Sequence, residues 1–253
     1  MLIKRPALAR GHADHGWLNA RHTFSFANYY DPRHQGFRAL RVINEDRIAP
    51  AAGFGMHGHQ DMEIITWLLG GSLRHHDSLG SGAVLRPGDA QVMSAGTGIR
   101  HSEVNASTSE PAHLLQIWIE PRSAGIAPRY ADRHFPLAER TNRLRPIATG
   151  WLSTAGTSAA AGTSAAAGTS EPGRDGSLPI HADADVFVAN LSPGTALSHD
   201  LAPGRHAWIQ VAHGALTVNG LDLGAGDGLA VSDQARLDLT AKSAAEILLF
   251  DLG

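Results

Sequence analysis

Short apolar or alternating runs, separated by turn residues, dominate this chain from about residue 22 onward. Such runs, bounded by Gly, Pro, Asp or Asn, lie at 22–27, 37–43, 62–69, 90–95, 113–120, 185–191, 207–212, 215–220 and 245–252. Apolar side chains that recur every second residue suit strands, whereas an amphipathic helix needs a period of 3.6 residues. Long helical periodicity is hard to find in this chain. The sequence therefore predicts an all-β protein made of sandwich or barrel domains.

The composition indicates in which compartment the protein works and which classes of partner it binds. The 253 residues are 43% hydrophobic, which is enough for a sizeable core, and the 21 Lys+Arg are spread along a chain of net charge −3. This spread of positive charge predicts no basic patch that would bind the phosphate backbone of nucleic acid. The absence of cysteine leaves only N and O ligands for a metal. With no signal-peptide h-region and no apolar run near the ~18 residues of a membrane span, we expect a cytoplasmic monomer without a membrane partner.

A low-complexity segment at 151–176 divides the chain. It contains two copies of AAAGTS, at 159–164 and 165–170, and has little apolar bulk to offset the entropy of ordering it. We expect a flexible linker between an N-terminal domain at 1–150 and a C-terminal domain at 177–253. A short Ala-rich helix is the alternative, although Gly156, Gly162 and Gly168 would interrupt it. Weak similarity between 68–75 and 211–218 hints at a duplicated β domain.

Two segments carry the candidate chemistry. Among 15 histidines a His-x-His pair is expected about once by chance, so His57 and His59 alone prove nothing. In a strand, side chains at i and i+2 project to the same face, so these two can point inward together, as can His101 and Glu103 on another strand. Two such strands facing each other in a small barrel would converge three imidazoles and a carboxylate. That set leaves open positions on a divalent ion, where a substrate can bind.

The segments HGHQDMEIITWLLGG (57–71) and SAGTGIRHSEVN (94–105) resemble the two metal motifs of the cupin superfamily. A wider match through 16–50 and 86–103 resembles the pirin family of bicupins, strongly over the first ~135 residues and loosely over the remainder. The resemblance implies two cupin domains in tandem, each a jelly-roll or double-stranded β-helix. It also implies that a divalent metal is bound in the N-terminal domain and that the C-terminal domain is degenerate.

The resemblance places the metal ligands at His57, His59, His101 and Glu103. Other cupins take their carboxylate from the position of Glu63, which strand alternation would also turn inward. Glu63 is therefore kept as a neighbour of the site or an alternative ligand. We expect iron first, with zinc, manganese, cobalt, nickel and copper as alternatives.

Two departures from the family pattern lie beside these ligands, and the second half of the chain lacks an equivalent set. Gly58 and Gln60 stand where the family commonly has Pro and Arg, and loss of that Arg would change the preference for substrate charge. Aligning the glycine turns of the two halves leaves no ligand set in the second half, because the residues opposite the four ligands are Asp200, Ala202, Leu239 and Ala241. We expect the C-terminal domain to close or pack against the metal domain.

Two functions fit this resemblance. Pirin-like bicupins include flavonol (quercetin) 2,3-dioxygenases, which implies a flavonol-like substrate and O₂. In that chemistry Glu103 is the catalytic base that takes the proton of the flavonol 3-hydroxyl, and the ring opens with loss of carbon monoxide. The alternative is a metal-dependent regulatory protein that acts on a protein partner without physiological turnover.

Overall fold

The computed structural model describes residues 1–150 and 173–253. The AAAGTS repeats lie outside the described residues. At the C-terminal end of the predicted linker, Arg174–Gly176 forms the short 3-10 helix η2.

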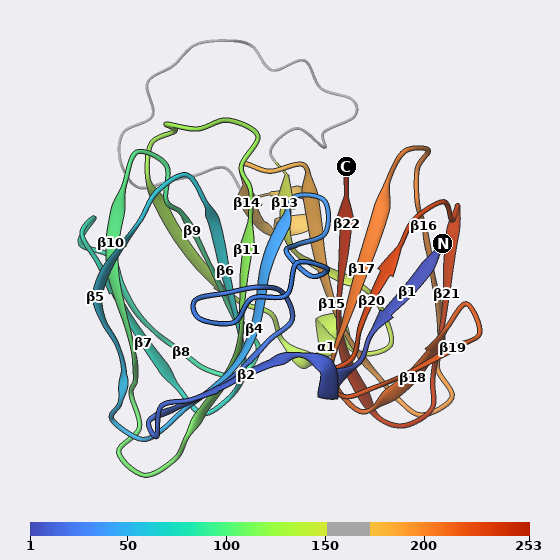
Figure 1. Cartoon of the computed structure of the whole chain (residues 1–253), viewed down its shortest axis with the longest axis horizontal. Coiled ribbons are helices and arrows are strands. Elements are labelled where there is room, and N and C mark those ends of the chain that lie inside the picture. The colour runs from blue at the N-terminus through green and yellow to red at the C-terminus, as the bar shows by residue number, and fades with distance from the viewer. Residues whose placement is uncertain (151–172) are drawn as a thin grey trace.

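Two seven-stranded sheets meet at the centre of the molecule, and each has a four-stranded sheet on its outer side (Figure 1). The helices of the described residues are short: η1 (Ala7–Ala9), α1 (Leu137–Arg140) and η2. None of them is long and apolar enough to cross a membrane. The prediction of an all-β protein is confirmed.

The N-terminal seven-stranded sheet has the order β12-β9-β6-β11-β4-β3-β2, and its four-stranded partner has the order β5-β10-β7-β8. Their strands are β2 (Gly11–Asp14), β3 (Leu18–His22), β4 (Leu40–Ile48), β5 (Gly53–His59), β6 (Glu63–Gly70), β7 (Leu73–Asp77), β8 (Gly82–Leu85), β9 (Asp89–Ser94), β10 (Ile99–Asn105), β11 (Ala112–Ile119) and β12 (Arg129–His134). The side chains between these two sheets form the interior of the N-terminal domain.

The C-terminal sheets repeat this plan, with the orders β1-β20-β17-β22-β15-β13-β14 and β16-β21-β18-β19. Their strands are β1 (Leu2–Arg5), β13 (Arg145–Gly150), β14 (Leu178–Ile180), β15 (Ala184–Leu191), β16 (Ala196–Asp200), β17 (His206–His213), β18 (Ala215–Val218), β19 (Leu221–Gly224), β20 (Gly228–Val231), β21 (Arg236–Ala241) and β22 (Ala245–Leu252). The interior of this domain is apolar, with leucines from β18, β20 and β21 fully buried.

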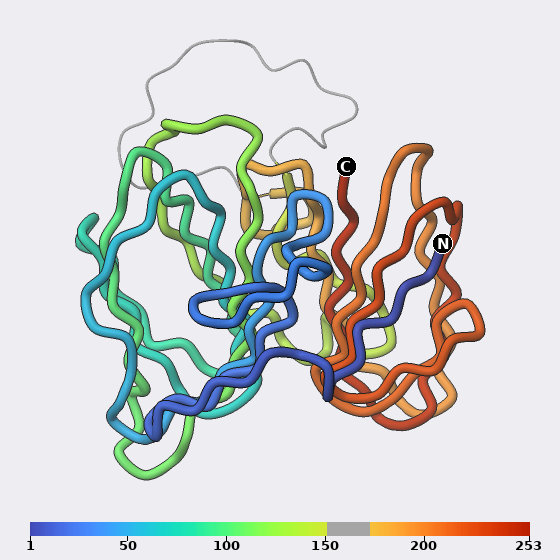
Figure 2. Tube along the Cα trace, in the orientation of Figure 1, coloured from blue at the N-terminus to red at the C-terminus, as the bar shows by residue number. Residues whose placement is uncertain are grey.

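Two segments from the predicted N-terminal half belong to the C-terminal sheet. Strand β1 pairs antiparallel with β20, and β13 pairs with β15. In Figure 2 the blue N-terminal segment runs beside the red strands of the C-terminal domain before it crosses to the other domain. The ion pair between Lys4 and Asp227, 2.8 Å apart, adds to this contact. The two domains are therefore joined at both ends of the N-terminal domain.

A shared hydrophobic core lies between the two seven-stranded sheets. It contains Trp67 and Phe24 from the N-terminal domain and Trp208 from the C-terminal domain. The strand predicted at 22–27 is wrong beyond His22, because the chain leaves the sheet there and Phe24 turns into this core, with its ring centroid 4.9 Å from that of Trp208. The indole N–H of Trp67 donates a hydrogen bond to Glu246 Oε1 at 2.7 Å.

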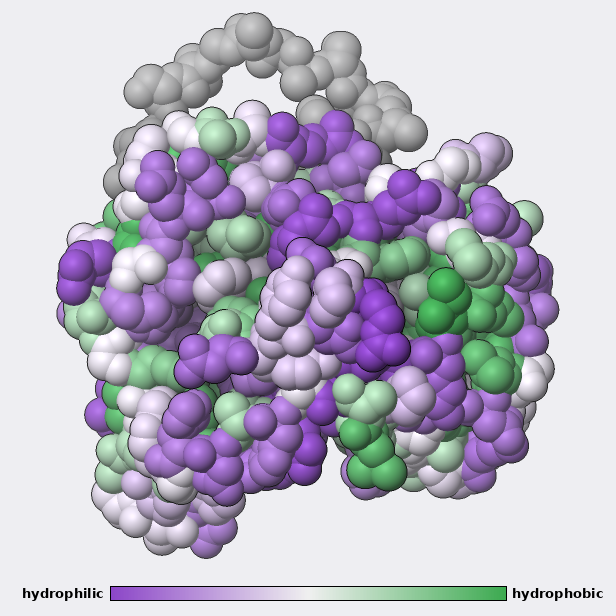
Figure 3. All heavy atoms as spheres, viewed as in Figure 1, coloured by the Kyte–Doolittle hydropathy of each residue, from purple (hydrophilic) through white to green (hydrophobic). Residues whose placement is uncertain are grey.

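The surface visible in Figure 3 is mostly hydrophilic. On this face the more hydrophobic residues gather on the right-hand side, over the strands of the C-terminal domain. The four-stranded sheet of the N-terminal domain also exposes single apolar side chains, among them Met56 and Val84.

Candidate metal centre

Strands β5 and β10 bring three histidines to one point. The two strands are antiparallel neighbours, and their register pairs His101 with His57. The ring centroids of His57 and His101 are 4.5 Å apart, those of His57 and His59 are 4.7 Å apart, and those of His59 and His101 are 4.9 Å apart. One ring nitrogen from each residue lies within 4.8 Å of the other two. The i, i+2 spacing thus acts as strand alternation predicts.

A bulge in β5 adds an aromatic side chain to this face. The register changes between the His101–His57 pair and the Glu103–Phe54 pair, so that two residues of β5 face a single residue of β10. A bulge of this kind shifts the alternation of the strand by one residue. Phe54 therefore lines the same cavity as His57, although the two are three positions apart. Strict alternation, as used in the sequence analysis, missed this residue.

Glu103 is held by side chains of the neighbouring sheet. It is buried, and its Oε1 accepts a hydrogen bond from Gln91 Nε2 at 2.5 Å, while its Oε2 accepts one from Gln116 Nε2 at 2.7 Å. Thr66 Oγ1 lies 3.2 Å from Oε1. Burial raises the pKa of Glu103, and these hydrogen bonds act in the opposite direction. A carboxylate oxygen of Glu103 lies within 4.8 Å of a ring nitrogen of His101, so the carboxylate adjoins the histidine cluster.

The hydrogen bonds of these rings, and the pKa values of two of them, leave ring nitrogens free to bind a divalent cation. His57 Nδ1 lies 2.8 Å from Gly55 O and can donate to it, which leaves the lone pair on His57 Nε2. His101 Nε2 is buried and has no hydrogen-bond partner among the described residues. Burial lowers the pKa of His59 to about 4 and that of His101 to about 3, so both rings are neutral near pH 7. Three imidazoles with a carboxylate beside them are a donor set for a divalent transition metal.

Two of the three clustered histidines, His57 and His59, line a cavity of about 220 Å³ in the N-terminal domain. It is lined by Leu18, Ala20, His22, Phe26, Asn44, Asp46, Phe54, His57, His59, Glu103, Gln116 and Trp118. An adjoining chamber of about 530 Å³ shares five of these residues and adds aromatic and histidine side chains from β2 and the following turns. Together the two spaces reach the usual range of small-molecule sites, about 300–1,000 Å³.

Asp46 is a further ionisable group in the cavity wall. Its Oδ1 is buried without a hydrogen-bond partner among the described residues. Burial raises the pKa of Asp46 to about 7, and the nearby carboxylates of Glu103 and Glu45 add to this rise. Asp46 was not predicted from the sequence, although a signal was present: Asn44 and Asp46 are polar residues at i and i+2 of β4, and strand alternation turns both toward the same face.

Comparisons with known proteins agree over the whole chain. The Pirin family model matches residues 4–119, and the model described as the quercetinase C-terminal cupin domain matches residues 169–252. Over 253 residues the chain is 45% identical to a protein named quercetin 2,3-dioxygenase from Escherichia coli (strain K12), which covers 100% of this chain and 99% of the relative. The chain belongs to the pirin family. The predicted pair of tandem cupin domains is thereby confirmed.

Two other relatives extend this picture. The pirin is 41% identical over 251 residues to a pirin-like protein from Caulobacter vibrioides, covering 99% of each chain. The crystal structure of the bacterial pirin YhhW in complex with nickel(II), from Escherichia coli, superposes with a TM-score of 0.87 at 44% identity, covering 100% of this chain and 99% of that one. A solved member of the family thus contains a divalent metal of the kind that the histidine cluster could hold.

Glu63 does not lie with the metal residues in this pirin. Its side chain projects on the same face of β6 as Ile65 and Trp67, which pack in the core between the two domains. Ser94 Oγ donates to Glu63 Oε2 at 2.8 Å, and the backbone of His181 in the C-terminal domain also hydrogen-bonds to this carboxylate. Burial raises the pKa of Glu63 to about 6. The expectation that alternation turns Glu63 toward the metal is wrong, because the opposite face of β6 approaches Glu103.

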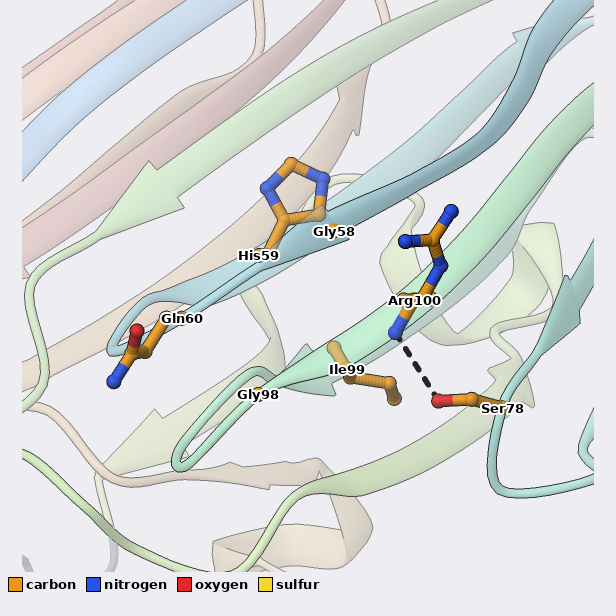
Figure 4. A pocket seen from close by; sticks show the side chains of 7 residues that line it. All are labelled: Gly58, His59, Gln60, Ser78, Gly98, Ile99 and Arg100. Carbon is orange, nitrogen blue, oxygen red and sulfur yellow. Dashed lines mark hydrogen bonds between the residues drawn. The ribbon is translucent and has the colours of Figure 1, made fainter.

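The two departures from the family pattern lie at an outer groove of about 540 Å³ (Figure 4). His59 lines both this groove and the cavity, so the two spaces adjoin at one candidate ligand. Arg100 comes from β10, where its backbone N–H donates to Ser78 Oγ at 3.1 Å. A Cβ added at Gly58 would lie 3.8 Å from Arg100 Cγ. The groove next to Gln60 therefore retains one cationic side chain, supplied by the neighbouring strand.

The corresponding strands of the C-terminal domain carry no such cluster. The register of β16 and β21 places Leu197 opposite Leu239 and His199 opposite Leu237, so the alignment that used Asp200 and Ala202 is shifted by three residues. The leucines of β21 are fully buried in the apolar interior. Two groups of potential metal ligands are found among the described residues, and both belong to the N-terminal domain: His57, His59 and His101, and His75, His101 and Glu103.

Proposed function

We propose that this pirin is a metal-dependent dioxygenase that cleaves flavonols such as quercetin with O₂. The observation that carries the proposal is that His57, His59 and Glu103, which adjoin His101, line a cavity with aromatic walls. Relatives named quercetin 2,3-dioxygenase, 45% identical over their full length, support the same activity.

His57, His59, His101 and Glu103 would hold the metal. Iron is the ion that we propose first, and zinc, manganese, cobalt, nickel and copper are the alternatives for a site built of N and O donors. A bound divalent ion would supply a Lewis acid that lowers the pKa of a substrate hydroxyl and a template that brings substrate and O₂ together.

Residues around the metal would bind and orient the flavonol. Trp118 and Phe54 provide apolar surface for flat aromatic rings. Asp46 Oδ1, which has no hydrogen-bond partner in the described part of the chain, would accept a hydrogen bond from a phenolic hydroxyl, which favours polyphenols over unsubstituted aromatic compounds. The side chains of Gln91 and Gln116 fix the orientation of the Glu103 carboxylate.

Glu103 would act as the base as well as a ligand. A carboxylate within reach of the flavonol 3-hydroxyl takes its proton, and general-base help of this kind is typically worth about 10²–10⁴ in rate. The deprotonated ring is electron-rich and is oxidised by O₂. Both oxygen atoms enter the products, and one ring carbon leaves as carbon monoxide.

An oxygen electrode and a carbon monoxide assay test the proposal. Purified protein of known metal content, reconstituted separately with each candidate ion, is given a panel of flavonols and, as a control, flavones that lack the 3-hydroxyl. We expect equimolar O₂ uptake and carbon monoxide release with flavonols alone. Absence of turnover with every ion would reject the enzyme and favour the alternative of a regulatory pirin with a protein partner.

A further inference from the structure

Behind His101, away from the cavity, lies a buried pair formed by His75 and Asp77 on β7. Their side chains are fully buried, and His75 Nε2 is 3.1 Å from Asp77 Oδ2. On its other side, His75 Nδ1 is 3.5 Å from His101 Nδ1. The three side chains thus form a chain of contacts that ends at His101 Nε2, the buried nitrogen without a partner among the described residues.

Two backbone N–H groups determine how this chain is polarised. Leu79 N and Ser81 N both donate to Asp77 Oδ1, at 2.9 Å and 3.0 Å. The second oxygen of Asp77, Oδ2, is left to accept a hydrogen bond from His75 Nε2–H. A neutral imidazole with its proton on Nε2 has its lone pair on Nδ1. His75 Nδ1 can then only accept from His101 Nδ1–H, which places the lone pair of His101 on Nε2.

The plane of the His75 ring is also held in place. Tyr130 stacks on it, with ring centroids 4.3 Å apart and an interplanar angle of 18°. The Tyr130 hydroxyl lies 3.3 Å from Gln91 Oε1, and the amide nitrogen of Gln91 donates to Glu103. These side chains therefore form one connected set that contacts both His101 and Glu103 on the side away from the cavity.

We propose that Asp77 and His75 are positioning residues that set the tautomer of His101, so that the Nε2 lone pair faces the metal. This inference rests on the metal site of the proposed function but not on the dioxygenase reaction. Hydrogen-bond partners of metal-binding histidines fix ring orientation and tautomer, and losing them typically costs about 10–100-fold in metal affinity.

Asp77→Asn reverses the polarity of the chain without changing its shape. The N–H groups of Leu79 and Ser81 keep the amide oxygen at the position of Oδ1, so the NH₂ group must face His75. His75 then accepts at Nε2 and donates from Nδ1, and His101 must carry its proton on Nε2. That proton blocks the nitrogen that would bind the metal.

Asp89→Asn is the matched control. Asp89 also pairs with a histidine, with Oδ1 2.6 Å from His134 Nδ1, and also accepts a backbone hydrogen bond, from Arg86 N to Oδ2 at 2.7 Å. Asp89 is the first residue of β9, and neither of its hydrogen-bond partners lines the cavity. The same chemical change is thus made at a pair that does not touch the metal residues.

The experiment measures nickel(II) affinity by competition with a coloured chelator and the His101 tautomer by ¹⁵N NMR of metal-free protein. We expect Asp77→Asn to bind nickel(II) at least 10-fold more weakly than wild type and Asp89→Asn to bind it equally well. In wild type, His101 should carry its proton on Nδ1; in Asp77→Asn it should carry it on Nε2.

Two results would overturn the proposal: nickel(II) affinity of Asp77→Asn within twofold of wild type, or a wild-type His101 protonated on Nε2. The wild-type spectrum decides even if the variant does not fold. Nickel(II) binding without flavonol turnover would reject the proposed enzyme and leave this inference standing. An unchanged nickel(II) affinity in a fully active Asp77→Asn variant would reject this inference and leave the proposed enzyme standing.

Discussion

Single residues decide the chemistry of the candidate site, and two buried glutamates show how. Glu103 lies beside His101 on β10, whereas Glu63 lies on β6 of the seven-stranded sheet, on the face that packs against the C-terminal domain. We expect Glu103→Gln to bind divalent metal more weakly and to lose most flavonol turnover, by about 10²–10⁴. Glu63→Gln should retain both. Metal analysis and O₂ uptake check this pair, and an active Glu103→Gln with an inactive Glu63→Gln would reassign the base.

Ionisation of the buried Asp46 carboxyl lowers the free energy of unfolding of the metal-free protein in a pH-dependent way. Burial raises its pKa from the ordinary 3.8 to about 7, so the folded state holds a proton that the unfolded chain has already lost. The contribution of Asp46 to stability is therefore present at low pH and is lost as pH rises through 7. We expect Asp46→Asn to raise the melting temperature of metal-free protein more at pH 8 than at pH 5. A smaller gain at pH 8 would contradict this assignment.

At the scale of elements, close contact between β5 and β10 brings the ligands together. A Cβ added at Gly53 would lie 2.3 Å from Glu103 O and 2.5 Å from Val104 Cα, both on the β10 backbone. At Gly55, two residues along the same strand, an added Cβ would meet nothing within 4 Å. The two glycines thus make a matched pair for testing this strand contact.

We expect Gly53→Ala to move β10 away from β5, lowering metal affinity and reducing the free energy of unfolding by about 1–3 kcal/mol, as overpacking usually does. Gly55→Ala should behave as wild type in both respects. Denaturant unfolding and a chelator competition measure the two effects. Equal losses in the two variants would mean that the bulged strand, rather than the close contact, is the sensitive feature.

At the scale of the whole molecule, the two domains share a core, and a strand from the N-terminal end of the chain joins the C-terminal sheet. Trp67 and Trp208 come from different domains but belong to one hydrophobic cluster, and β1 completes the C-terminal sheet. Neither domain can lose its structure without exposing apolar surface of the other. We infer that the protein unfolds as one cooperative unit, although its chain folds into two similar halves.

Calorimetry of metal-free protein should therefore show a single transition, which nickel(II) at 100 times its dissociation constant should stabilise by about 2.7 kcal/mol. His101→Ala should show the single transition without the shift. Two transitions, of which metal moves only one, would show that the domains unfold independently. A single transition that metal does not move would contradict the metal site.

The all-β class and the shared face of His57 and His59 follow from local pattern. Apolar alternation is a property of neighbouring residues, and the i, i+2 spacing of His57 and His59 puts both side chains on one face whatever the strand pairs with. The similarity to the pirin family, which spans nearly the whole chain, added the second strand with His101. These features need no knowledge of the tertiary structure.

Other features depend on which strand pairs with which, and in what register. Alternation could not say which face of β6 meets the metal, so it misplaced Glu63, and it could not foresee the bulge that turns Phe54 inward. The pairing of β7 with β10 alone sets His75 and Asp77 behind the site. Local sequence determined which residues could act together; long-range strand pairing, which no short stretch encodes, decided which of them meet.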